Sequence, residues 1–358
     1  MDDTLDKDNH RTAFDEYGGW SYLLSILFKK QDLTEDLAKD ALNEILAGKA
    51  TEAQIAAFAA ALRVKGETVD EMSGLVRAMM DNAEIIPLSG DLIDTCGTGG
   101  DRSGSINVST MAACVVAGSG AMVCKHGGRA ASSKAGSADV LEELGVVIDL
   151  PPEKVAQCVI EAGFGFCFAP RFHPAMRYAA PVRRSLGAPT VFNLLGPLAN
   201  PARTNRQVVG IGDSSMAETM LGVLEKSHIV HAMVLYGHDG MDEISTVTTS
   251  TIHESRLLQN GTYERRIYQI DPGDFGIKTS TKEELSGGDV QENALHVRNI
   301  LSGERGPKRD IVILNAAAGL IVAGKVRDFA EGVELAQSII DSGKALEALD
   351  RLIDISNM

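Results

Sequence analysis

From Asp91 onward, short apolar runs alternate with helix-like stretches, and this alternation constrains the fold more than any other feature of the chain. The expected strands are Leu92–Thr95, Ala121–Cys124, Phe164–Phe168, Val208–Ile211, Ala232–Tyr236 and Ile311–Leu314. The expected helices between them include Ser109–Ala117, Ala138–Leu144, Pro152–Ala162 and Ser215–Lys226. Strands and helices in alternation are typical of an α/β domain with a mostly parallel central sheet flanked by helices.

The chain before this region has a different pattern, which predicts a separate all-α domain. Apolar residues at helical spacing follow two capping-box patterns, Thr51-x-x-Gln54 and Thr68-x-x-Glu71. The run Leu37–Ile45 predicts another helix, which Gly48 closes. Since these helices carry no obvious catalytic group, we interpret them as a layer for packing or oligomer formation.

These patterns divide the chain into two domains. We expect a helical domain over residues 1–86 and an α/β domain over residues 87–358. The segment 174–200 is helix-like but interrupted by breakers such as Pro181 and Gly187. We expect its helices to pack back on the N-terminal domain.

Composition and charge exclude several classes of protein. The formal net charge of −15 argues against a nucleic-acid backbone or an anionic membrane as the main partner. The five cysteines are scattered without a CxxC pair, which favours reduced thiols over a disulfide scaffold or a zinc site. The acidic, polar start is unlike a signal peptide, and no apolar run reaches the roughly 20 residues of a membrane span. We therefore expect a cytoplasmic protein.

A glycine-rich loop follows the first expected strand and precedes a helix. It reads DTCGTGGDRSGSINVST from Asp94 to Thr110. Glycines let the backbone approach a ligand closely, and free N–H groups at a helix N-terminus bind anions. Read alone, the loop is either a turn or a phosphate cradle.

The next strand is followed by a second loop of this kind, CKHGGRAASSKAGSAD from Cys124 to Asp139, which adds the cations Lys125, Arg129 and Lys134. Ligands of open α/β sheets bind at the carboxyl ends of the strands, so both loops can face one ligand with several phosphates. The chain has neither GxxxxGK[ST] nor GxGxxG, which disfavours a Walker A site and a Rossmann dinucleotide site.

Acidic side chains gather after the strand expected at Ala232–Tyr236, in the segment YGHDGMDEIS. Read alone, this segment is either a solvated acidic turn or a site for a hard cation. Mg²⁺ is usually held by one or two carboxylates and by substrate phosphates. Because carboxylates beside a polyphosphate pocket would otherwise repel the ligand, the magnesium interpretation is favoured.

Arginines lie among apolar residues in APRFHPAMRYAAPVRRSLG, from Ala169 to Gly187. An arginine fork suits a carboxylate, and helical spacing puts Arg183 on a different face from Arg177 and Arg184. His173 is expected to pack rather than to catalyse. Since no Ser–His–Asp triad is evident, we expect chemistry driven by positioning and electrostatics.

Six motifs in order, GTGGD, NVST, KHGGRAASSKAGSADVLEELG, FAPRFHPAMRYAAPVRRSLG, TVFNLLGPLANPA and HDGMDE, resemble the anthranilate phosphoribosyltransferases of tryptophan biosynthesis. The resemblance covers roughly residues 37–320. It implies a homodimer formed through the helical domain and binding of phosphoribosyl diphosphate by the α/β domain. It also implies Mg²⁺-dependent transfer of ribose 5-phosphate from phosphoribosyl diphosphate to the amine of anthranilate, with release of pyrophosphate.

The resemblance also implies roles for individual residues. Phosphoribosyl diphosphate would be bound by Gly97, Gly100, Asp101, Ser105, Asn107, Val108, Ser109, Thr110, Lys125, His126, Gly127, Gly128, Arg129, Ala130, Ala131, Ser132, Ser133 and Ser137. Magnesium would be bound by Ser109, Asp242 and Glu243. Anthranilate would be bound by Gly97, Gly128 and Arg183. No residue is implied as a covalent nucleophile.

One residue departs from the family pattern. The family usually reads KHGNR, whereas this chain has Gly128 in place of the asparagine. In the family, that asparagine belongs to the anthranilate pocket. The difference therefore changes the binding site of the acceptor, whereas the phosphate and metal motifs are unchanged.

Two other functions are compatible with this architecture. It is similar to that of pyrimidine nucleoside phosphorylases, but HDGMDE together with FNLLGPL disfavours that activity. A non-enzymatic relative that binds nucleic acid should have a basic surface, which a net charge of −15 disfavours.

Overall fold

The N-terminal part of the molecule is a bundle of helices. The computed structural model describes residues 13–130 and 134–358, so Ala131, Ser132 and Ser133 lie outside the described residues. The bundle contains α1 (Ala13–Glu16), α2 (Gly19–Phe28), α3 (Glu35–Leu46), α4 (Glu52–Lys65) and α5 (Val69–Asp81). Both expected capping boxes are present at the starts of α4 and α5, where each threonine accepts from the N–H three residues later.

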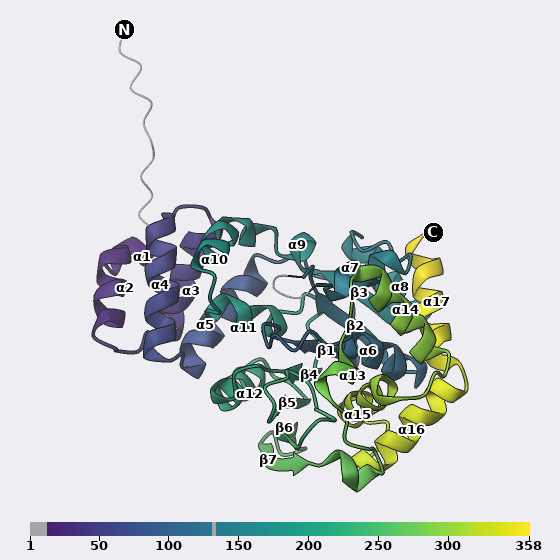
Figure 1. Cartoon of the computed structure of the whole chain (residues 1–358). Helices are drawn as coiled ribbons and strands as arrows, with labels where there is room; N and C mark the ends of the chain where they lie inside the picture. Colours follow the sequence, from purple (N-terminus) through teal and green to yellow (C-terminus); the bar gives the residue numbers. More distant parts are fainter. Residues whose placement is uncertain (1–12, 131–133) are drawn as a thin grey trace.

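The larger part is built on one sheet of seven strands in the order β3-β2-β1-β4-β5-β6-β7. Its strands are β1 (Leu92–Gly97), β2 (Met122–Gly127), β3 (Phe164–Phe168), β4 (Arg206–Gly210), β5 (His231–Gly237), β6 (Ser250–Leu257) and β7 (Tyr263–Ile270). Strands β1 to β5 pair in parallel, and β6 and β7 add an antiparallel edge. The expected fold class, an all-α domain and an α/β domain with a mostly parallel sheet, is confirmed (Figure 1).

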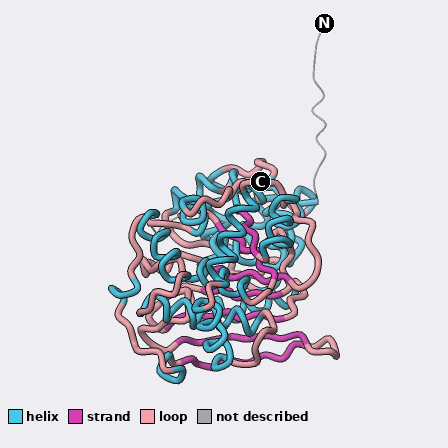
Figure 2. Tube along the Cα trace, turned by 90° about the vertical axis from the view of Figure 1, so that its right-hand side faces the viewer, coloured by secondary structure: helices cyan, strands magenta, loops and turns pink. Residues whose placement is uncertain are grey.

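Helices cover both faces of this sheet, because the strands bury apolar side chains on both faces. Along β5, Met233 and Leu235 lie in one buried hydrophobic cluster, and Ala232 and Val234 lie in a second cluster on the opposite face. Figure 2 shows the strands stacked in one sheet with helices lying across them. The helices of this part are α6 (Val108–Gly118), α7 (Ser137–Glu143), α8 (Pro152–Ala162), α9 (Ala169–Phe172), α12 (Ala217–Lys226), α13 (Lys282–Leu285), α14 (Val290–Leu301), α15 (Pro307–Val322), α16 (Phe329–Asp341) and α17 (Lys344–Ser356), with the short helices η2 (Ser214–Met216) and η3 (Pro272–Phe275).

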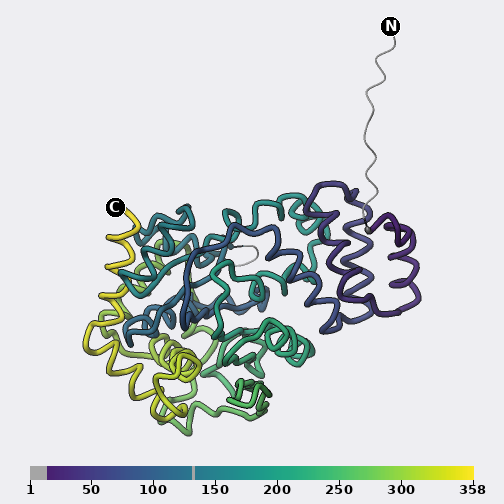
Figure 3. The backbone as a smooth tube through the Cα atoms, turned by 180° about the vertical axis from the view of Figure 1, so that it is seen from behind, coloured from purple at the N-terminus to yellow at the C-terminus, as the bar shows by residue number. Residues whose placement is uncertain are grey.

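A central segment joins the two parts of the molecule. It forms η1 (Pro174–Tyr178), α10 (Ala180–Leu186) and α11 (Val191–Leu198). These elements contact α3, α4 and α5, and their apolar side chains share one buried cluster with the N-terminal helices and with α12 (Figure 3). The N-terminal bundle is thereby fixed to the sheet rather than tethered by a linker.

Two sequence expectations differ from the structure. The run Ile311–Leu314 is not a strand but part of α15, a helix buried around its whole circumference, so its apolar residues are continuous. Strands β6 and β7 were not expected, because their exposed residues include many charged side chains. They form a hairpin whose turn contains Asn260 and Gly261, and Gly261 has a φ of +82°.

Candidate active site

Four neighbouring parallel strands end in a glycine at their carboxyl ends, along the same side of the sheet. Strands β1, β2, β4 and β5 end at Gly97, Gly127, Gly210 and Gly237. The segment after β5 folds back over this edge. A Cβ on Gly210 would lie 1.6 Å from the Asp242 carbonyl oxygen, and a Cβ on Gly97 would lie 2.4 Å from Asp242 Oδ2. Only glycine at these two positions lets the acidic segment sit against the strand ends.

The first glycine-rich loop turns through left-handed backbone conformations. Gly99, Gly100 and Gly104 have φ of +65°, +78° and +65°. An added Cβ on Gly100 would have no heavy atom of the described residues within 4 Å, so this part of the loop is open toward a ligand. The Gly99 N–H donates to Asp242 Oδ2 over 2.8 Å, which ties the loop to the acidic segment.

The loop leads into the N-terminus of α6, where polar atoms lack partners. Asn107 is the residue before the helix, and its Nδ2 donates to the Ala135 carbonyl over 3.2 Å, which links the two glycine-rich loops. Within the described residues, Asp101 Oδ2, Asn107 Oδ1 and Thr110 Oγ1 are buried without a hydrogen-bond partner. Buried polar atoms are rarely left unpaired, so these atoms indicate a place where a ligand or ion belongs. Val108 is buried and Ser105 forms a bridge with Ser286.

Lys125 supplies a buried positive charge at the centre of this edge. Its side chain is 2% exposed, and Nζ donates to the Thr95 carbonyl and, over 3.2 Å, to Ser109 Oγ. Burial raises the pKa of Glu243, and the Lys125 cation and the Ser109 N–H, which donates to the Glu243 carboxylate, oppose that rise. Lys125 and Ser109 therefore hold the acidic segment from the side of β2 and α6.

Three carboxyl groups face one another across this site. Burial, and next the nearby Asp101 carboxyl, raise the pKa of Asp242 to about 7. Burial and the Asp242 carboxyl raise the pKa of Glu243 well above its ordinary value. A divalent cation would neutralise the neighbouring carboxyl groups that raise the pKa values of Asp242 and Glu243.

The donor set fits magnesium. Across residues 13–130 and 134–358, no group of three or more His, Cys, Asp or Glu side chains is arranged so that it could hold a metal ion. Mg²⁺ does not depend on such a group, because it keeps water and substrate phosphate oxygens among its ligands. The unpartnered Asp101 Oδ2 and the clustered carboxyl groups are the oxygens it prefers. His238 and Asp239, in the same segment, instead bind Thr251 Oγ1 and Ser245 Oγ.

The second loop is only partly directed at the site. The Arg129 guanidinium pairs with Asp139 and Glu142 over 2.9 and 2.7 Å, and the Ala130 N–H donates to Asp139 Oδ2. These two groups are therefore engaged with α7. A Cβ on Gly127 would lie 2.4 Å from Ser137 Oγ, so the end of β2 and the start of α7 are in close contact.

His126 contacts α11, and Gly128 lies nearest to α9. His126 Nδ1 donates to the Gly196 carbonyl over 2.9 Å, and its Nε2 is buried with no partner in the described part of the chain. Burial lowers the pKa of His126 to about 3, so the ring is neutral. Among the described residues, a Cβ on Gly128 would meet only the Ala169 Cβ, at 4.0 Å, and the backbone there has no positive φ. No described residue therefore requires glycine at position 128.

Arg183 is a partly buried cation without an acidic partner. It lies on α10, and no ion pair or hydrogen bond of its guanidinium is found among the described residues. Burial alone lowers the pKa of Arg183. An arginine that is desolvated but unpaired is suited to a carboxylate supplied by a ligand. As expected, His173 packs: it is 5% exposed, and its Nε2 donates to the Ala199 carbonyl over 2.8 Å.

Several supporting residues were not found from sequence. Asn315 on α15 accepts from the Ile244 N–H over 2.8 Å and donates to the Ile244 carbonyl over 2.9 Å, directly after Glu243. Asp94 and Asn200 hold β2 in the same way, because Asp94 accepts from the His126 N–H and Asn200 donates to the Cys124 carbonyl. Of these supporting residues, only Asn315 had a signal in the sequence, because it is a single polar residue within the apolar run ILNAAAGL.

Comparisons with known proteins agree with this architecture. The helical bundle domain of the glycosyl transferase family matches residues 21–83, and its α/β domain matches residues 89–346. The chain is 51% identical to anthranilate phosphoribosyltransferase of Thermomicrobium roseum, over 91% of this chain and 94% of that protein. It is 48% identical to that of Chloroflexus aggregans, over 93% and 97% of the two chains.

Solved structures give the same result. Anthranilate phosphoribosyltransferase from Thermus thermophilus superposes with a TM-score of 0.86 at 39% identity, over 94% of this chain and 99% of that one. The Saccharomyces cerevisiae enzyme in complex with PRPP and Mg superposes with a TM-score of 0.85 at 27% identity, over 95% and 99%. The glycine-rich loops, the acidic segment and the two matched domains thus place the chain in the anthranilate phosphoribosyltransferase family.

Proposed function

We propose that the chain transfers the 5-phosphoribosyl group of phosphoribosyl diphosphate to the amine of anthranilate, which releases pyrophosphate, in tryptophan biosynthesis. This proposal rests on the contact between the glycine-rich loop and the Asp242 carboxylate, which has the Asp101 carboxyl as a neighbour. Arg183 on α10, which has no side-chain partner among the described residues, is the cation available for a carboxylate of the ligand. Relatives 51% and 48% identical over nearly their whole length bear this name.

The diphosphate is bound by the first loop and the start of α6. The loop after Gly97 is open toward a ligand at Gly100, and the N-terminus of an eleven-residue helix favours anions. Asn107 and the residues up to Thr110 orient the ligand, and Lys125 to Gly128 of the second loop lie on its other side. The Arg129 guanidinium stays paired with α7, so this residue contributes through its backbone.

Asp242, Glu243 and Ser109 would hold Mg²⁺, with Asp101 beside them. When bound, the ion supplies charge neutralisation for the departing pyrophosphate. Lys125 keeps Ser109 and Glu243 in place from the buried side. Asn315 fixes the backbone directly after Glu243, so the carboxylates cannot withdraw when the ligand binds.

Arg183 binds the carboxylate of anthranilate and presents its amine to the anomeric carbon. The C–O bond to the diphosphate breaks, the C–N bond forms, and the amine loses one proton. An aniline is already neutral at pH 7, so positioning rather than a strong base drives the step. The S. cerevisiae enzyme has also been solved with 4-fluoroanthranilate, at a TM-score of 0.83 and 26% identity.

The proposal is tested by the loss of anthranilate fluorescence when phosphoribosyl diphosphate and Mg²⁺ are added to the purified protein. We expect turnover that requires both additions. Thymidine phosphorolysis without any phosphoribosyl transfer would instead establish a nucleoside phosphorylase. A gel shift at physiological salt, with no turnover of either kind, would establish a nucleic-acid-binding relative.

We also propose a homodimer formed through the helical domain, which comprises residues 1–86 and is joined by residues 174–200, in a cytoplasmic enzyme. Tyr17, Tyr22 and Phe28, on and beside α1 and α2, are 54%, 48% and 68% exposed, and exposed aromatic groups of this kind favour protein contacts. The measurement is light scattering after size exclusion, with Phe28→Glu expected to yield monomer. The described residues contain no helix that is both long and apolar enough to cross a membrane.

A further inference from the structure

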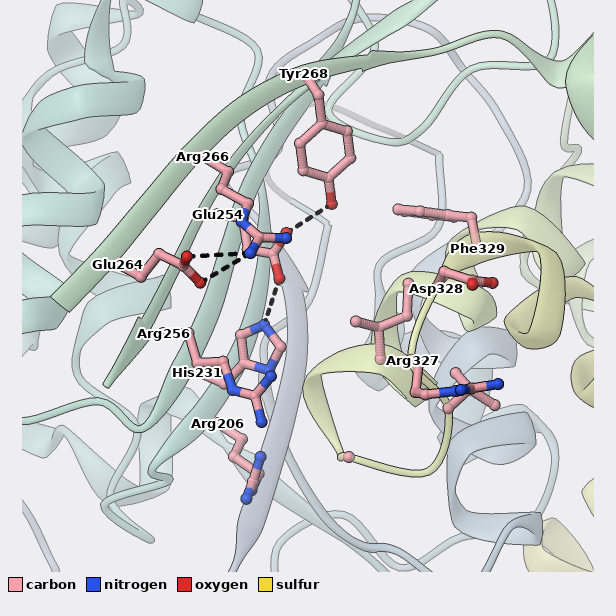
Figure 4. A pocket seen from close by; sticks show the side chains of 13 residues that line it. Arg206, His231, Glu254, Arg256, Glu264, Arg266, Tyr268, Arg327, Asp328 and Phe329 are labelled. Carbon is pink, nitrogen blue, oxygen red and sulfur yellow. Dashed lines mark hydrogen bonds and ion pairs between the residues drawn. The ribbon is translucent and has the colours of Figure 1, made fainter. Parts of the chain in front are cut away.

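A cavity lies at the end of the sheet where β4 and β5 begin, opposite to the strand ends that form the active site. Its volume is about 570 Å³, and it opens between strands β4 to β7 and the connection from α15 to α16 (Figure 4). Arg206 and His231, which line it, are the first residues of β4 and β5. The active-site loops follow the other ends of these parallel strands, so the two sites are separate. We call this space the arginine cavity, after Arg206, Arg256, Arg266 and Arg327 in its lining.

Strand register explains why charged side chains collect on this wall. His231 lies opposite Arg256, Arg256 lies opposite Glu264, and Glu254 lies opposite Arg266. Side chains two residues apart on a strand share a face, so these residues project from the same face of the sheet. The other face carries Ser255 and Arg265, which bind Glu225 of α12.

Most charges in the cavity are already engaged. Arg266 lies 3.1 Å from both carboxylate oxygens of Glu264, and Arg327 pairs with Glu331. Glu254 accepts from His231 Nε2 over 2.8 Å and from the Tyr268 hydroxyl over 2.9 Å. The carboxylates of Glu254 and Glu264 thus have their donors within the wall.

Two arginines keep unused donors. The Arg206 guanidinium binds Asp91 and the Val322 carbonyl, but its Nε is buried with no partner in the described residues. The Arg256 guanidinium has no ion pair or hydrogen bond to any residue that the structure describes, although Glu264 is its neighbour across the strands. Figure 4 shows Arg206, His231 and Arg256 following one another along the strand side of the cavity. In a chain of net charge −15, this is a local excess of donors for an anion.

The opposite wall carries apolar side chains beside Arg327 and Asp328, whose carboxylate accepts from the Glu331 N–H. Phe329, at the start of α16, faces the strands in Figure 4, and its ring centroid lies 6.4 Å from that of Tyr268, edge to face. Ile321 and Val326 continue this surface. A cavity with a partly apolar wall and a few convergent polar groups has the composition of a small-molecule site, and its volume is within the usual range.

We propose that the arginine cavity binds a small organic anion, whose carboxylate or phosphate pairs with Arg256 and the Nε of Arg206 and whose flat apolar part lies against Tyr268 and Phe329. The alternative is a purely structural ion-pair network that holds the β6–β7 hairpin to α16. The two differ at Arg256, which has no structural partner in the described residues but is central to ligand binding.

The test uses phenyl phosphate and phenylacetate as probes, with phenol as their neutral counterpart, in calorimetric titrations of the wild-type protein. Arg256→Met is compared with Arg305→Met, which removes the same charge from another exposed arginine without a partner among the described residues. 4-Bromophenyl phosphate soaked into crystals locates the bound ring through the anomalous scattering of bromine.

We expect bromine in the arginine cavity and binding of at least one anionic probe that is about tenfold weaker or more in Arg256→Met, as loss of a charged hydrogen bond implies. Arg305→Met should bind like the wild type. Arg256→Lys, which keeps the charge but not the fork, should be intermediate. Absence of bromine from the cavity, equal affinity in Arg256→Met and wild type, or equally tight binding of phenol would overturn the proposal.

Discussion

Replacing Gly97 with alanine places a methyl group in space that the Asp242 carboxylate occupies. The added Cβ would lie 2.4 Å from Asp242 Oδ2 and 3.1 Å from its Cγ, so the oxygen must retreat by about 1 Å before an ordinary contact is restored. The backbone at Gly97 has no positive φ, so alanine causes no conformational strain there. The perturbation is therefore confined to the carboxylate and the atoms that it touches.

The displacement breaks the 2.8 Å hydrogen bond from the Gly99 N–H to Asp242 Oδ2. Hydrogen bonds to charged groups contribute about 1.5–3 kcal/mol, which corresponds to a loss of roughly 10- to 150-fold in kcat/KM if the contact serves the transition state. A misplacement of about 1 Å has effects of similar size on positioned groups. We expect Gly97→Ala to lower kcat/KM by roughly 10- to 150-fold and to raise the Mg²⁺ concentration required for half-maximal rate.

The assay is the loss of anthranilate fluorescence at a series of Mg²⁺ concentrations, with thermal unfolding measured in parallel to show that the variant is folded. If the folded variant keeps kcat/KM within about threefold of wild type with an unchanged Mg²⁺ dependence, Asp242 does not serve the metal and the reasoning is refuted. A fall in kcat/KM that is the same at every Mg²⁺ concentration would place the effect at the acceptor instead.

Four further results are expected. Replacing both Asp242 and Glu243 with alanine should lower kcat/KM by at least ~100-fold, or about 3 kcal/mol, in steady-state assays, and near wild-type turnover would contradict the metal assignment. Arg183→Ala should raise KM for anthranilate alone, and Arg183→Lys should restore little of the loss; equal effects on both substrates would indicate a structural role. Gly128→Asn, whose Cβ no described residue obstructs, should lower KM for anthranilate by roughly 2- to 10-fold and favour it over a methyl-substituted analogue, whereas reduced activity would mean a pocket built around glycine. Because burial lowers the pKa of His126 to about 3 from an unfolded value near 6.5, the unfolded chain binds the extra proton, so stability should fall as pH decreases from about 6.5 toward 3; an imidazole titration by NMR with a midpoint above 6 would disprove this.

The architecture was predictable where local patterns are unambiguous. Capping boxes at Thr51 and Thr68 set helix starts because a side chain and a backbone N–H three residues apart suffice to form them. Strands buried on both faces, such as β1 and β5, are short apolar runs between loops. The run at Ile311–Leu314 failed as a strand because a helix buried on every side has the same local pattern.

By itself, the sequence determined the elements that its local patterns specify, the order of the phosphate and acidic motifs, and through them the family. The tertiary structure decided which groups face the ligand. Only the fold shows that Arg129 is engaged with α7, that Gly97 and Gly210 make room for Asp242, and that Asn315, 71 residues beyond Ile244, fixes the acidic segment. The same holds for the arginine cavity, whose residues come from four strands and a helix connection. Contacts between residues far apart in the chain depend on strand order and register, which no local pattern contains.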